Sequence, residues 1–387
     1  MKEAEKVALL QKSVRLHTLI CSATLLVAVL LLRFTAQNTE FNARRWLMFS
    51  ALVVAAEFWY LRRVLRQNHH PNSDRLYPDL GAANLLTIYR GLAYAWMAGF
   101  LLLPRPGGPM DWLPAILYVA ASITDVIDGY VARKTDRVSK LGETLDMESD
   151  GLGVLVACML AVQYGQLPLV FLLVGFARPL FVGGMLLRTR MGLPNYPMTE
   201  SNQRRIIAGL LMIFLSTVLW PIFRPPETYV VGAVFGGAVT LSFVRDWLVN
   251  IGWISPGHLT YRIWRARLKQ WSFLWIPVGL RILAAALTSL LVVRLLSGSS
   301  DMPAVANLLI ALVGALGGAA VLLGVATRSA AGLVSLASYL GYALAGQAAL
   351  GLALLFISSL LIVLGSGQFT LWIPEERWLR IGAIVDD

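Results

Sequence analysis

The chain alternates long apolar runs with short polar connections along most of its 387 residues. An apolar run of about 20 residues, wound as an α-helix, is long enough to cross the roughly 30 Å hydrocarbon core of a bilayer. Twelve such runs stand out, each bounded by Pro, Gly or charged residues. They lie at about residues 17–34, 46–61, 84–103, 112–133, 143–164, 166–188, 203–221, 228–250, 274–296, 303–325, 329–346 and 348–366. We therefore predict an all-α, polytopic integral membrane protein with about twelve spans.

The connections divide the chain into four predicted regions. Residues 1–79 hold an N-terminal transmembrane hairpin and a polar linker, and residues 80–250 hold a core of six spans. Residues 251–272 form a basic linker, in which aromatic and cationic residues at helical spacing are typical of a helix lying along the lipid headgroups. Residues 273–387 form a C-terminal four-helix membrane domain rich in Gly, Ala and Leu. Small residues such as Gly and Ala let helices pack closely in lipid.

Composition excludes an ordinary soluble enzyme. Hydrophobic residues make up 57% of the chain and charged residues only 14%, where a soluble domain carries roughly 25% charged residues. The net charge of +11 could suggest nucleic-acid binding. The cations lie between the apolar runs rather than in one patch, so we predict no nucleic-acid partner and contact with membrane lipids instead.

The same cations predict the topology of the core. Lys and Arg number 18 on one side of the six core spans and two, Arg105 and Arg224, on the other. Because cytoplasmic connections carry the excess of Lys and Arg, the connections at 133–140 and 188–205 are predicted to be cytoplasmic. We therefore expect a multi-pass protein of the cytoplasmic (inner) cell membrane whose N-terminus also lies in the cytoplasm.

Acidic residues gather at one place. Five of the 12 Asp lie between residues 125 and 150, next to or within two predicted spans, where charge is costly and usually functional. Asp125 and Asp128 are at i and i+3, and Asp146 and Asp150 at i and i+4, so each pair faces one side of its helix. Four crowded carboxylates repel one another unless cations neutralise them. Since all-oxygen ligation favours hard ions, the pattern predicts a Mg²⁺ or Mn²⁺ site.

These residues spell D-x2-D-G-x2-A-R-x8-G-x3-D-x3-D, from Asp125 to Asp150. This is the motif of the CDP-alcohol phosphotransferase (CDP-alcohol phosphatidyltransferase) family, which residues 80–250 resemble with all eight fixed positions present. The resemblance implies a six-helix core and a membrane enzyme of phospholipid synthesis. Such an enzyme transfers a phosphatidyl group from CDP-diacylglycerol, or a related CDP-lipid, to a small polar alcohol and releases CMP. Its active site would face the cytoplasm.

The resemblance also implies roles for individual residues. Asp125, Asp128, Asp146 and Asp150 would ligate two divalent ions, and Asp150 would be the general base that deprotonates the acceptor hydroxyl. The residues expected to bind the nucleotide are Gly129, Ala132, Arg133 and Gly142 of the motif, together with Asn84 and Thr87 of a segment, Asn84 to Arg90, similar to the family's N-x-L-T-x-x-R. The candidates for acceptor binding are Arg178, Thr199, Gln203 and Arg245. A homodimer is expected as well.

Three alternatives stay open from the residues. The first keeps the chemistry and transfers a CDP-linked polar headgroup to a lipid alcohol such as diacylglycerol. The second is a membrane transporter, since many spans and a mid-chain charge cluster are typical of transporters. The third is an inactive scaffold, suggested by the large flanking regions. The C-terminal block also resembles small DoxX-like membrane proteins, through residues 324–332 and 365–371, and we interpret it as a packing or partner module.

Overall fold

The computed structural model describes residues 3–36, 40–73, 75–196, 202–225, 227–255, 263–264, 266–267, 270–297 and 302–374. The named helices in these ranges include twelve α-helices, and no β-strand occurs among the described residues. The all-α class predicted from the sequence is confirmed. Most of the basic linker around residues 256–269 lies outside the described residues.

Each predicted apolar run corresponds to one α-helix. In chain order the helices are α1 (Glu3–Thr35), α2 (Ala43–Val64), α3 (Gly81–Ala98), α4 (Leu113–Lys134), α5 (Lys140–Gln163), α6 (Leu172–Arg190), α7 (Asn202–Val218), α8 (Glu227–Asn250), α10 (Ile276–Leu296), α11 (Ala304–Leu323), α12 (Thr327–Ala345) and α13 (Ala348–Leu364). The helix pattern of the sequence therefore locates every one of these elements to within a few residues, except that α1 begins well before its apolar run.

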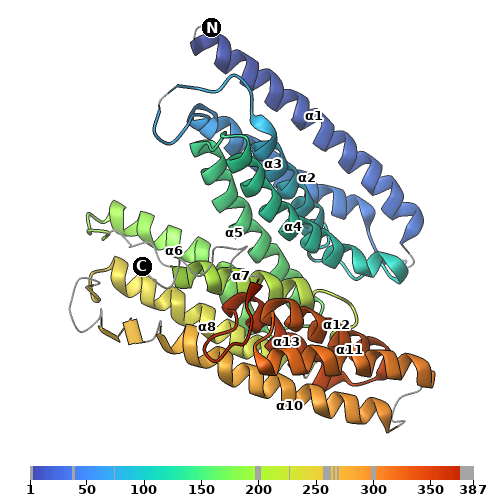
Figure 1. Cartoon of the computed structure of the whole chain (residues 1–387). Coiled ribbons are helices and arrows are strands. Elements are labelled where there is room, and N and C mark those ends of the chain that lie inside the picture. Colours follow the sequence, from blue (N-terminus) through green and yellow to red (C-terminus); the bar gives the residue numbers. More distant parts are fainter. Residues whose placement is uncertain are drawn as a thin grey trace. The chain divides into compact units, whose positions relative to one another are not determined.

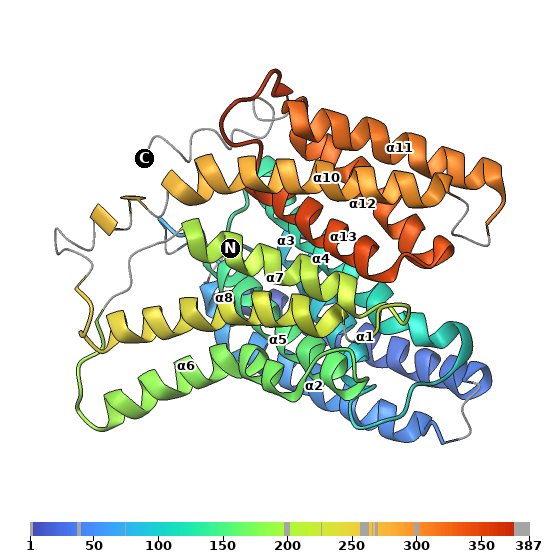
Figure 2. The ribbon, with the colours of Figure 1, turned by 90° about the horizontal axis from the view of Figure 1, so that it is seen from below.

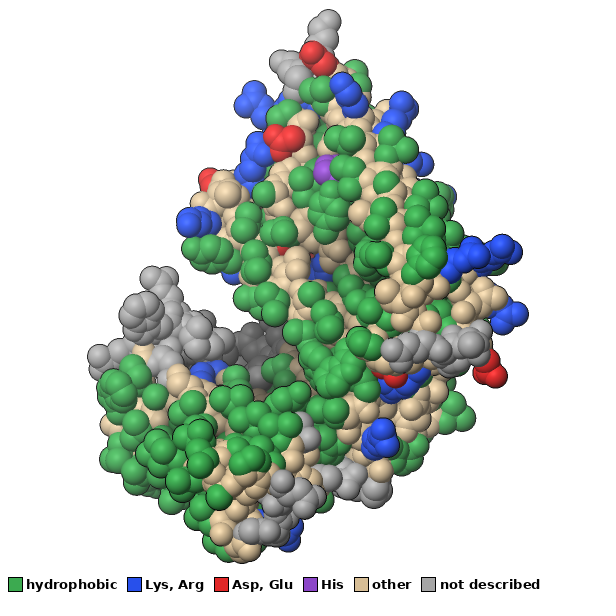
Figure 3. All heavy atoms as spheres, turned by 90° about the vertical axis from the view of Figure 1, so that its right-hand side faces the viewer, with side chains coloured by type: hydrophobic (Ala, Val, Ile, Leu, Met, Phe, Trp, Pro, Cys, Tyr) green, Lys and Arg blue, Asp and Glu red, His purple; other side chains and the backbone are tan. Residues whose placement is uncertain are grey.

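Six helical segments in the described part of the chain are long and apolar enough to cross a membrane. They contain α1, α4, α6, α8, α10 and α11. Among the other six, α7 and α13 have only 17 residues each, and α5 carries several charged residues. Hydrophobic side chains cover wide areas of the face shown in Figure 3, and Leu19 and Phe34 of α1 are 69% and 83% exposed. The protein is thus a polytopic membrane protein, and the total of twelve spans stays a prediction.

The helices form two compact units. The first comprises Met1–Leu180 with Leu215–Arg224, and the second comprises Phe181–Phe214 with Pro225–Asp387. In the first unit α2 packs against α1 and α3, and α3 packs against α4 and α5 (Figure 1). In the second unit α10, α11, α12 and α13 run together as a bundle (Figure 2), and α13 also contacts α8. The four regions predicted from the sequence are not tested by this division.

The N-terminal hairpin is fixed to α3 by aromatic packing. The side chain of Asn42 caps α2 by accepting hydrogen bonds from the backbone N–H groups of Arg44 and Arg45. One turn later the fully buried Trp46 lies edge-on to Trp96 and Phe100. A Cβ on Gly99 would lie 2.5 Å from the Trp46 ring nitrogen, so only glycine permits this close approach.

A tight turn joins α4 to α5 and sets the position of both helices. Asp136 adopts a left-handed conformation with φ of 50°, and the N–H of Arg137 returns to the carbonyl of Ala132 at 2.9 Å. Ser139 then caps α5 by accepting a hydrogen bond from the N–H of Gly142. The Arg137 guanidinium also pairs with Asp79, which ties the preceding linker to this turn.

The C-terminal bundle contains a buried cation that joins several of its segments. Arg281 of α10 is only 4% exposed and donates hydrogen bonds to five backbone carbonyls. Two belong to the end of α11, at Val321 and Leu322, and three belong to the segment after α13, at Ser366, Gln368 and Phe369. The last carbonyls of a helix have no partner within it, so Arg281 satisfies groups that are otherwise unpaired. Arg281 thereby anchors the segment after α13 to the end of α11.

We expect Arg281→Met to destabilise the protein by more than about 3 kcal/mol, because several buried carbonyls lose their donor at once. The measurement is thermal unfolding of the purified full-length protein in detergent. Arg294→Met is the matched control on the same helix, since Arg294 is exposed and its Nη1 lies 3.3 Å from Gln347 Oε1. Equal unfolding temperatures for Arg281→Met and the control would contradict the role given to Arg281.

Candidate active site

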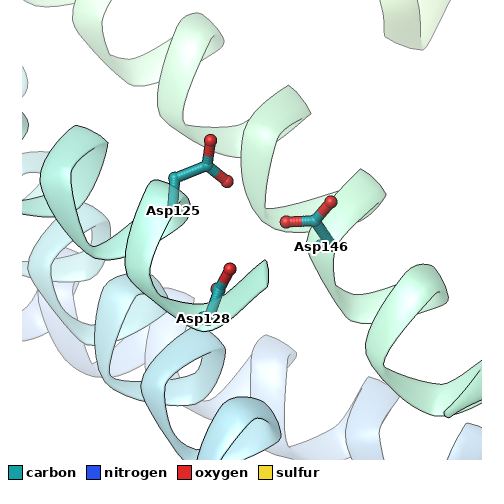
Figure 4. A group of neighbouring side chains, drawn as sticks. All are labelled: Asp125, Asp128 and Asp146. Atoms are coloured by element: carbon teal, nitrogen blue, oxygen red, sulfur yellow. The ribbon is translucent and has the colours of Figure 1, made fainter. Parts of the chain in front are cut away.

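Four Asp side chains come from α4 and α5 at the spacing that the sequence predicts. Asp125 and Asp128 lie one turn apart on α4, and Asp146 and Asp150 lie one turn apart on α5. Figure 4 shows the carboxylates of Asp125, Asp128 and Asp146 pointing toward one another across the space between the two helices. One oxygen from each of these three lies within 4.8 Å of the others. The two helices thus present a common acidic centre.

A single guanidinium lies at the middle of this centre. Arg90 of α3 is 1% exposed, and its side chain is fully buried. It pairs with Asp125, with Asp146 at 2.5 Å, with Asp150 at 3.4 Å and with Asp128 at 3.7 Å. A buried charge is stable only when it is paired and hydrogen-bonded. Arg90 therefore joins α3, α4 and α5 through one set of ion pairs.

Two further contacts on α3 hold the centre in place. Thr87 donates a hydrogen bond to Asp128 Oδ2 at 2.8 Å, which fixes the least exposed of the four carboxylates. Asn84 is 5% exposed and exchanges hydrogen bonds with the Ser139 hydroxyl, which itself caps α5. A Cβ on Gly142 would lie 2.6 Å from the Asn84 amide oxygen. The absence of a side chain at Gly142 is thus what lets α5 begin against α3.

Nearer the C-terminal end of α5, helices α3 and α5 again approach closely. A Cβ on Gly153 would lie 2.4 Å from the buried Tyr94 ring. Asp146 and Asp150 lie between this contact and the one at Gly142, on the segment of α5 that both contacts hold against α3. The carboxylates are therefore held by rigid, closely packed helices, which is what a site that must keep its ligands in fixed geometry requires.

The residues fit a divalent metal centre. One guanidinium balances one of four carboxylates, so with all four ionised the centre keeps three uncompensated negative charges. Oδ1 of Asp150 is buried and accepts no hydrogen bond within the described part of the chain. An acidic set that is short of positive charge and holds a buried oxygen without a hydrogen bond is suited to hard cations such as Mg²⁺ or Mn²⁺.

The residues predicted to bind a nucleotide fall into two groups. Gly129, Ala132 and Arg133 lie on the last two turns of α4, and the three atoms nearest to a Cβ placed on Gly129 all belong to the Arg133 guanidinium. Arg133 itself is exposed, so this side of α4 has room for a ligand. Asn84, Thr87 and Gly142, by contrast, contribute to the buried contacts that position the helices. A nucleotide role for all six stays a prediction.

The candidate acceptor residues belong to different units or lie outside the described residues. Arg178 of α6 pairs with Glu148 of α5 at 2.9 Å, within the first unit. Arg245 of α8 lies in the second unit, 4.0 Å from Asp246. Thr199 and the side chain of Gln203 lie outside the described residues. The prediction of an acceptor site from these four residues is therefore untested.

Sequence reasoning missed the role of Arg90. The residue stands in the predicted span 84–103, where it is the sole basic residue. The sequence shows Arg90 only as the last residue of a segment that resembles the family. Its position on α3 opposite both Asp pairs depends on how the three helices pack. A single charge within an apolar run is the signal that could have revealed it.

The fold and the acidic centre define a class: an all-α polytopic membrane protein with a four-carboxylate site around a buried guanidinium. Residues 80–253 match the CDP-alcohol phosphatidyltransferase family. The chain therefore carries a CDP-alcohol phosphatidyltransferase domain, which confirms the resemblance inferred from the motif at Asp125 to Asp150.

Curated relatives match parts of the same region. The CDP-diacylglycerol--glycerol-3-phosphate 3-phosphatidyltransferase of Cereibacter sphaeroides is 37% identical over 106 residues, 26% of this chain and 47% of that protein. The proteins of that name from Bacillus subtilis and Rickettsia bellii are 40% identical over 71 residues and 35% identical over 112 residues. These alignments cover 18% and 28% of this chain. The chain spans between 37% and 58% of the length of these three relatives. No solved structure shows a significant match to the chain.

We expect Mn²⁺ to raise the unfolding temperature of the purified protein, because cations relieve the repulsion among the four carboxylates. Asp125→Asn and Asp146→Asn should each weaken Mn²⁺ binding by more than about tenfold. The readouts are thermal unfolding and the paramagnetic signal of bound Mn²⁺. Asp136→Asn is the matched control, since Asp136 is exposed and lies in the turn between the two helices. Unchanged Mn²⁺ binding in both site variants would exclude the centre as a metal site.

Arg90→Gln should lower the unfolding temperature most strongly when divalent ions are chelated. The variant leaves four carboxylates without their counter-charge, and breaking a buried ion pair costs about 3–5 kcal/mol. Added Mg²⁺ should then stabilise the variant more than it stabilises the wild type. The exposed Arg133→Gln serves as the control for loss of one positive charge. If Arg90→Gln in chelator unfolds at the temperature of that control, Arg90 does not hold the centre together.

Proposed function

We propose that the protein transfers a phosphatidyl group from CDP-diacylglycerol, or a related CDP-lipid, to a small polar alcohol and releases CMP. The observation that carries this proposal is the convergence of Asp125, Asp128, Asp146 and Asp150 within a CDP-alcohol phosphatidyltransferase domain. Their spacing on two helices matches the family motif at all fixed positions. The relatives' names support the direction of transfer, because each names CDP-diacylglycerol as one substrate.

The acidic residues divide two tasks in this reaction. Asp125, Asp128, Asp146 and Asp150 would hold the divalent ions, which when bound would supply the positive charge that neutralises a diphosphate. Asp150 takes the proton of the acceptor hydroxyl, and the hydroxyl oxygen attacks the phosphorus that bears the lipid. The bond from that phosphorus to the oxygen of CMP breaks, and CMP leaves. Asp150 suits this task because its Oδ1 accepts no hydrogen bond from the described residues.

Other residues of the domain orient the CDP-lipid. Arg133 at the end of α4 is exposed, and a guanidinium there can pair with the diphosphate. Gly129 and Ala132 keep this side of the helix free of bulk beside the nucleotide. Arg90 fixes the relative positions of the four carboxylates before substrate arrives. Pre-organised charge of this kind lowers the barrier because little rearrangement is needed in the transition state.

Glycerol 3-phosphate is the first acceptor to test, because the relatives are named for it. A phosphorylated acceptor needs cations, and Arg178, Arg245, Thr199 and Gln203 remain the candidates to bind it. We further propose that the site faces the cytoplasm in the inner cell membrane, as the excess of Lys and Arg on that side supports. A homodimer is proposed by analogy with the family alone.

The test is CMP release by the purified full-length protein with CDP-diacylglycerol, Mg²⁺ or Mn²⁺ and a panel of acceptors that includes glycerol 3-phosphate, serine and inositol phosphate. Asp150→Asn should lower the rate by at least about 100-fold, since it removes the general base. Asp136→Asn should keep the wild-type rate, because Asp136 lies off the motif.

Two results would overturn the proposal. Release of CMP only with CDP-choline or CDP-ethanolamine and diacylglycerol would show that a polar headgroup is transferred instead. Absence of release with every substrate pair, in protein that still binds Mn²⁺, would favour a transporter or an inactive scaffold.

A further inference from the structure

A cavity lies between α2 of the N-terminal hairpin and helices α3 and α5 of the domain. It has a volume of about 220 Å³ and is lined by residues of α2, α3 and α5, all within the first unit. Its walls are largely apolar, with Phe58 of α2 and Leu152 of α5 among them. Because α2 lies outside the residues that match the family, this cavity is not a feature of the matched domain alone.

Two carboxylates face this mostly apolar cavity. Glu57 comes from α2 and Glu148 from α5. Glu148 pairs with Arg178 at 2.9 Å, whereas Glu57 makes no hydrogen bond or ion pair with any described residue. The Glu57 carboxylate lies against the backbone of α3, since a Cβ on Gly91 would lie 2.5 Å from its Oε1. A carboxylate within a predicted membrane span is costly when it is ionised without a partner, and no described residue supplies Glu57 with a cation.

A second polar group of the cavity wall, on Ser149, also lacks a hydrogen-bond partner in the described part of the chain. Ser149 of α5 lines the cavity, is 8% exposed, and its Oγ has no hydrogen-bond partner among the described residues. Tyr60 also lines the cavity. A carboxylate and an aromatic residue together are suited to a ligand that donates hydrogen bonds and is positively charged. The apolar walls suit methylene groups attached to that charge.

The cavity and the acidic centre use different faces of α5. Leu145, Ser149 and Leu152 follow the helical repeat along the face that lines the cavity. Asp146 and Asp150 are each displaced by one residue, about 100° around the helix, toward Arg90. Thr87 is shared, because it lines the cavity and donates to Asp128. The cavity is thus a neighbour of the acidic centre and not part of it.

We propose that this cavity binds a primary ammonium group on a short hydrocarbon stem, with Glu57 as its ion-pair partner. A free amino alcohol and the headgroup of an amine-bearing phospholipid share this chemistry. The volume of the cavity accommodates either a small amino alcohol or such a headgroup. The proposal does not depend on the transfer reaction: neither Glu57 nor Ser149 belongs to the acidic centre, and Thr87 is the residue that the cavity and the centre share.

The experiment measures thermal unfolding of the full-length protein through its tryptophan fluorescence, without any CDP-lipid. One arm titrates ethanolamine hydrochloride into protein in detergent, against sodium chloride of equal ionic strength and against ethylene glycol, which lacks the ammonium group. The other arm compares nanodiscs of phosphatidylglycerol with nanodiscs that also contain phosphatidylethanolamine. A saturable rise in unfolding temperature with ethanolamine identifies a free amine as ligand, and a rise with phosphatidylethanolamine alone identifies a headgroup.

Matched variants assign the effect to the cavity. Glu57→Gln should weaken the response at least about tenfold, since it removes the charge and keeps the shape. Glu143→Gln, an exposed carboxylate on α5 outside the cavity, should respond as the wild type does. Should Glu57→Gln fail to fold, Ser149→Leu fills the cavity from α5 and should abolish the response.

The proposal is overturned if neither arm stabilises the wild-type protein. It is equally overturned if ethylene glycol reproduces the effect of ethanolamine, or if Glu57→Gln and Ser149→Leu both respond as the wild type does. Since the assay contains no CDP-lipid, these outcomes are distinct from a failure of CMP release.

Discussion

The ion pairs between Arg90 and four aspartates constrain the rest of the first unit. Charges in an apolar interior are stable only when their partners are held at short range, so α3, α4 and α5 must approach closely enough for one guanidinium to reach all four carboxylates. That approach requires glycine at Gly142 and Gly153, where any side chain would collide with α3. It also requires a short turn between α4 and α5, which the left-handed Asp136 and the Ser139 cap provide. The helix packing and the chemistry of the site therefore depend on the same contacts.

The sequence predicts much of this arrangement, and what it leaves out is the packing between helices. Hydrophobic runs locate all twelve α-helices because the signal is local. The spacing of Asp125, Asp128, Asp146 and Asp150 predicts two acidic helix faces for the same reason. How α3 is rotated against those faces depends on contacts distant in sequence. Asn84 is the example: resemblance assigns it to nucleotide binding, whereas in the structure it is buried against Ser139.

Charged residues explain why hydropathy alone does not mark α2 and α5 as spans, whereas α7 and α13 are short at 17 residues each. The acidic residues of α5 and the two Arg at the end of α2 lower the mean hydropathy of helices that pack within the first unit. The resemblance to a known family compensates for this low mean hydropathy, because the fixed positions of the family motif include charged residues. It extends only over residues 80–253, however, so it gives no information on the hairpin or on the C-terminal bundle.

Three charged side chains within predicted spans show how differently such groups are stabilised here. Arg90 is balanced by four carboxylates, and Arg281 by five backbone carbonyls. Glu57 has neither kind of partner among the described residues, although it lies against Gly91, next to Arg90 in the sequence. The first two are explained by what they hold together. Glu57 has no such role among the described residues, and a membrane span gains no stability from an unpaired carboxylate. We therefore relate it to the ligand that we propose for the cavity.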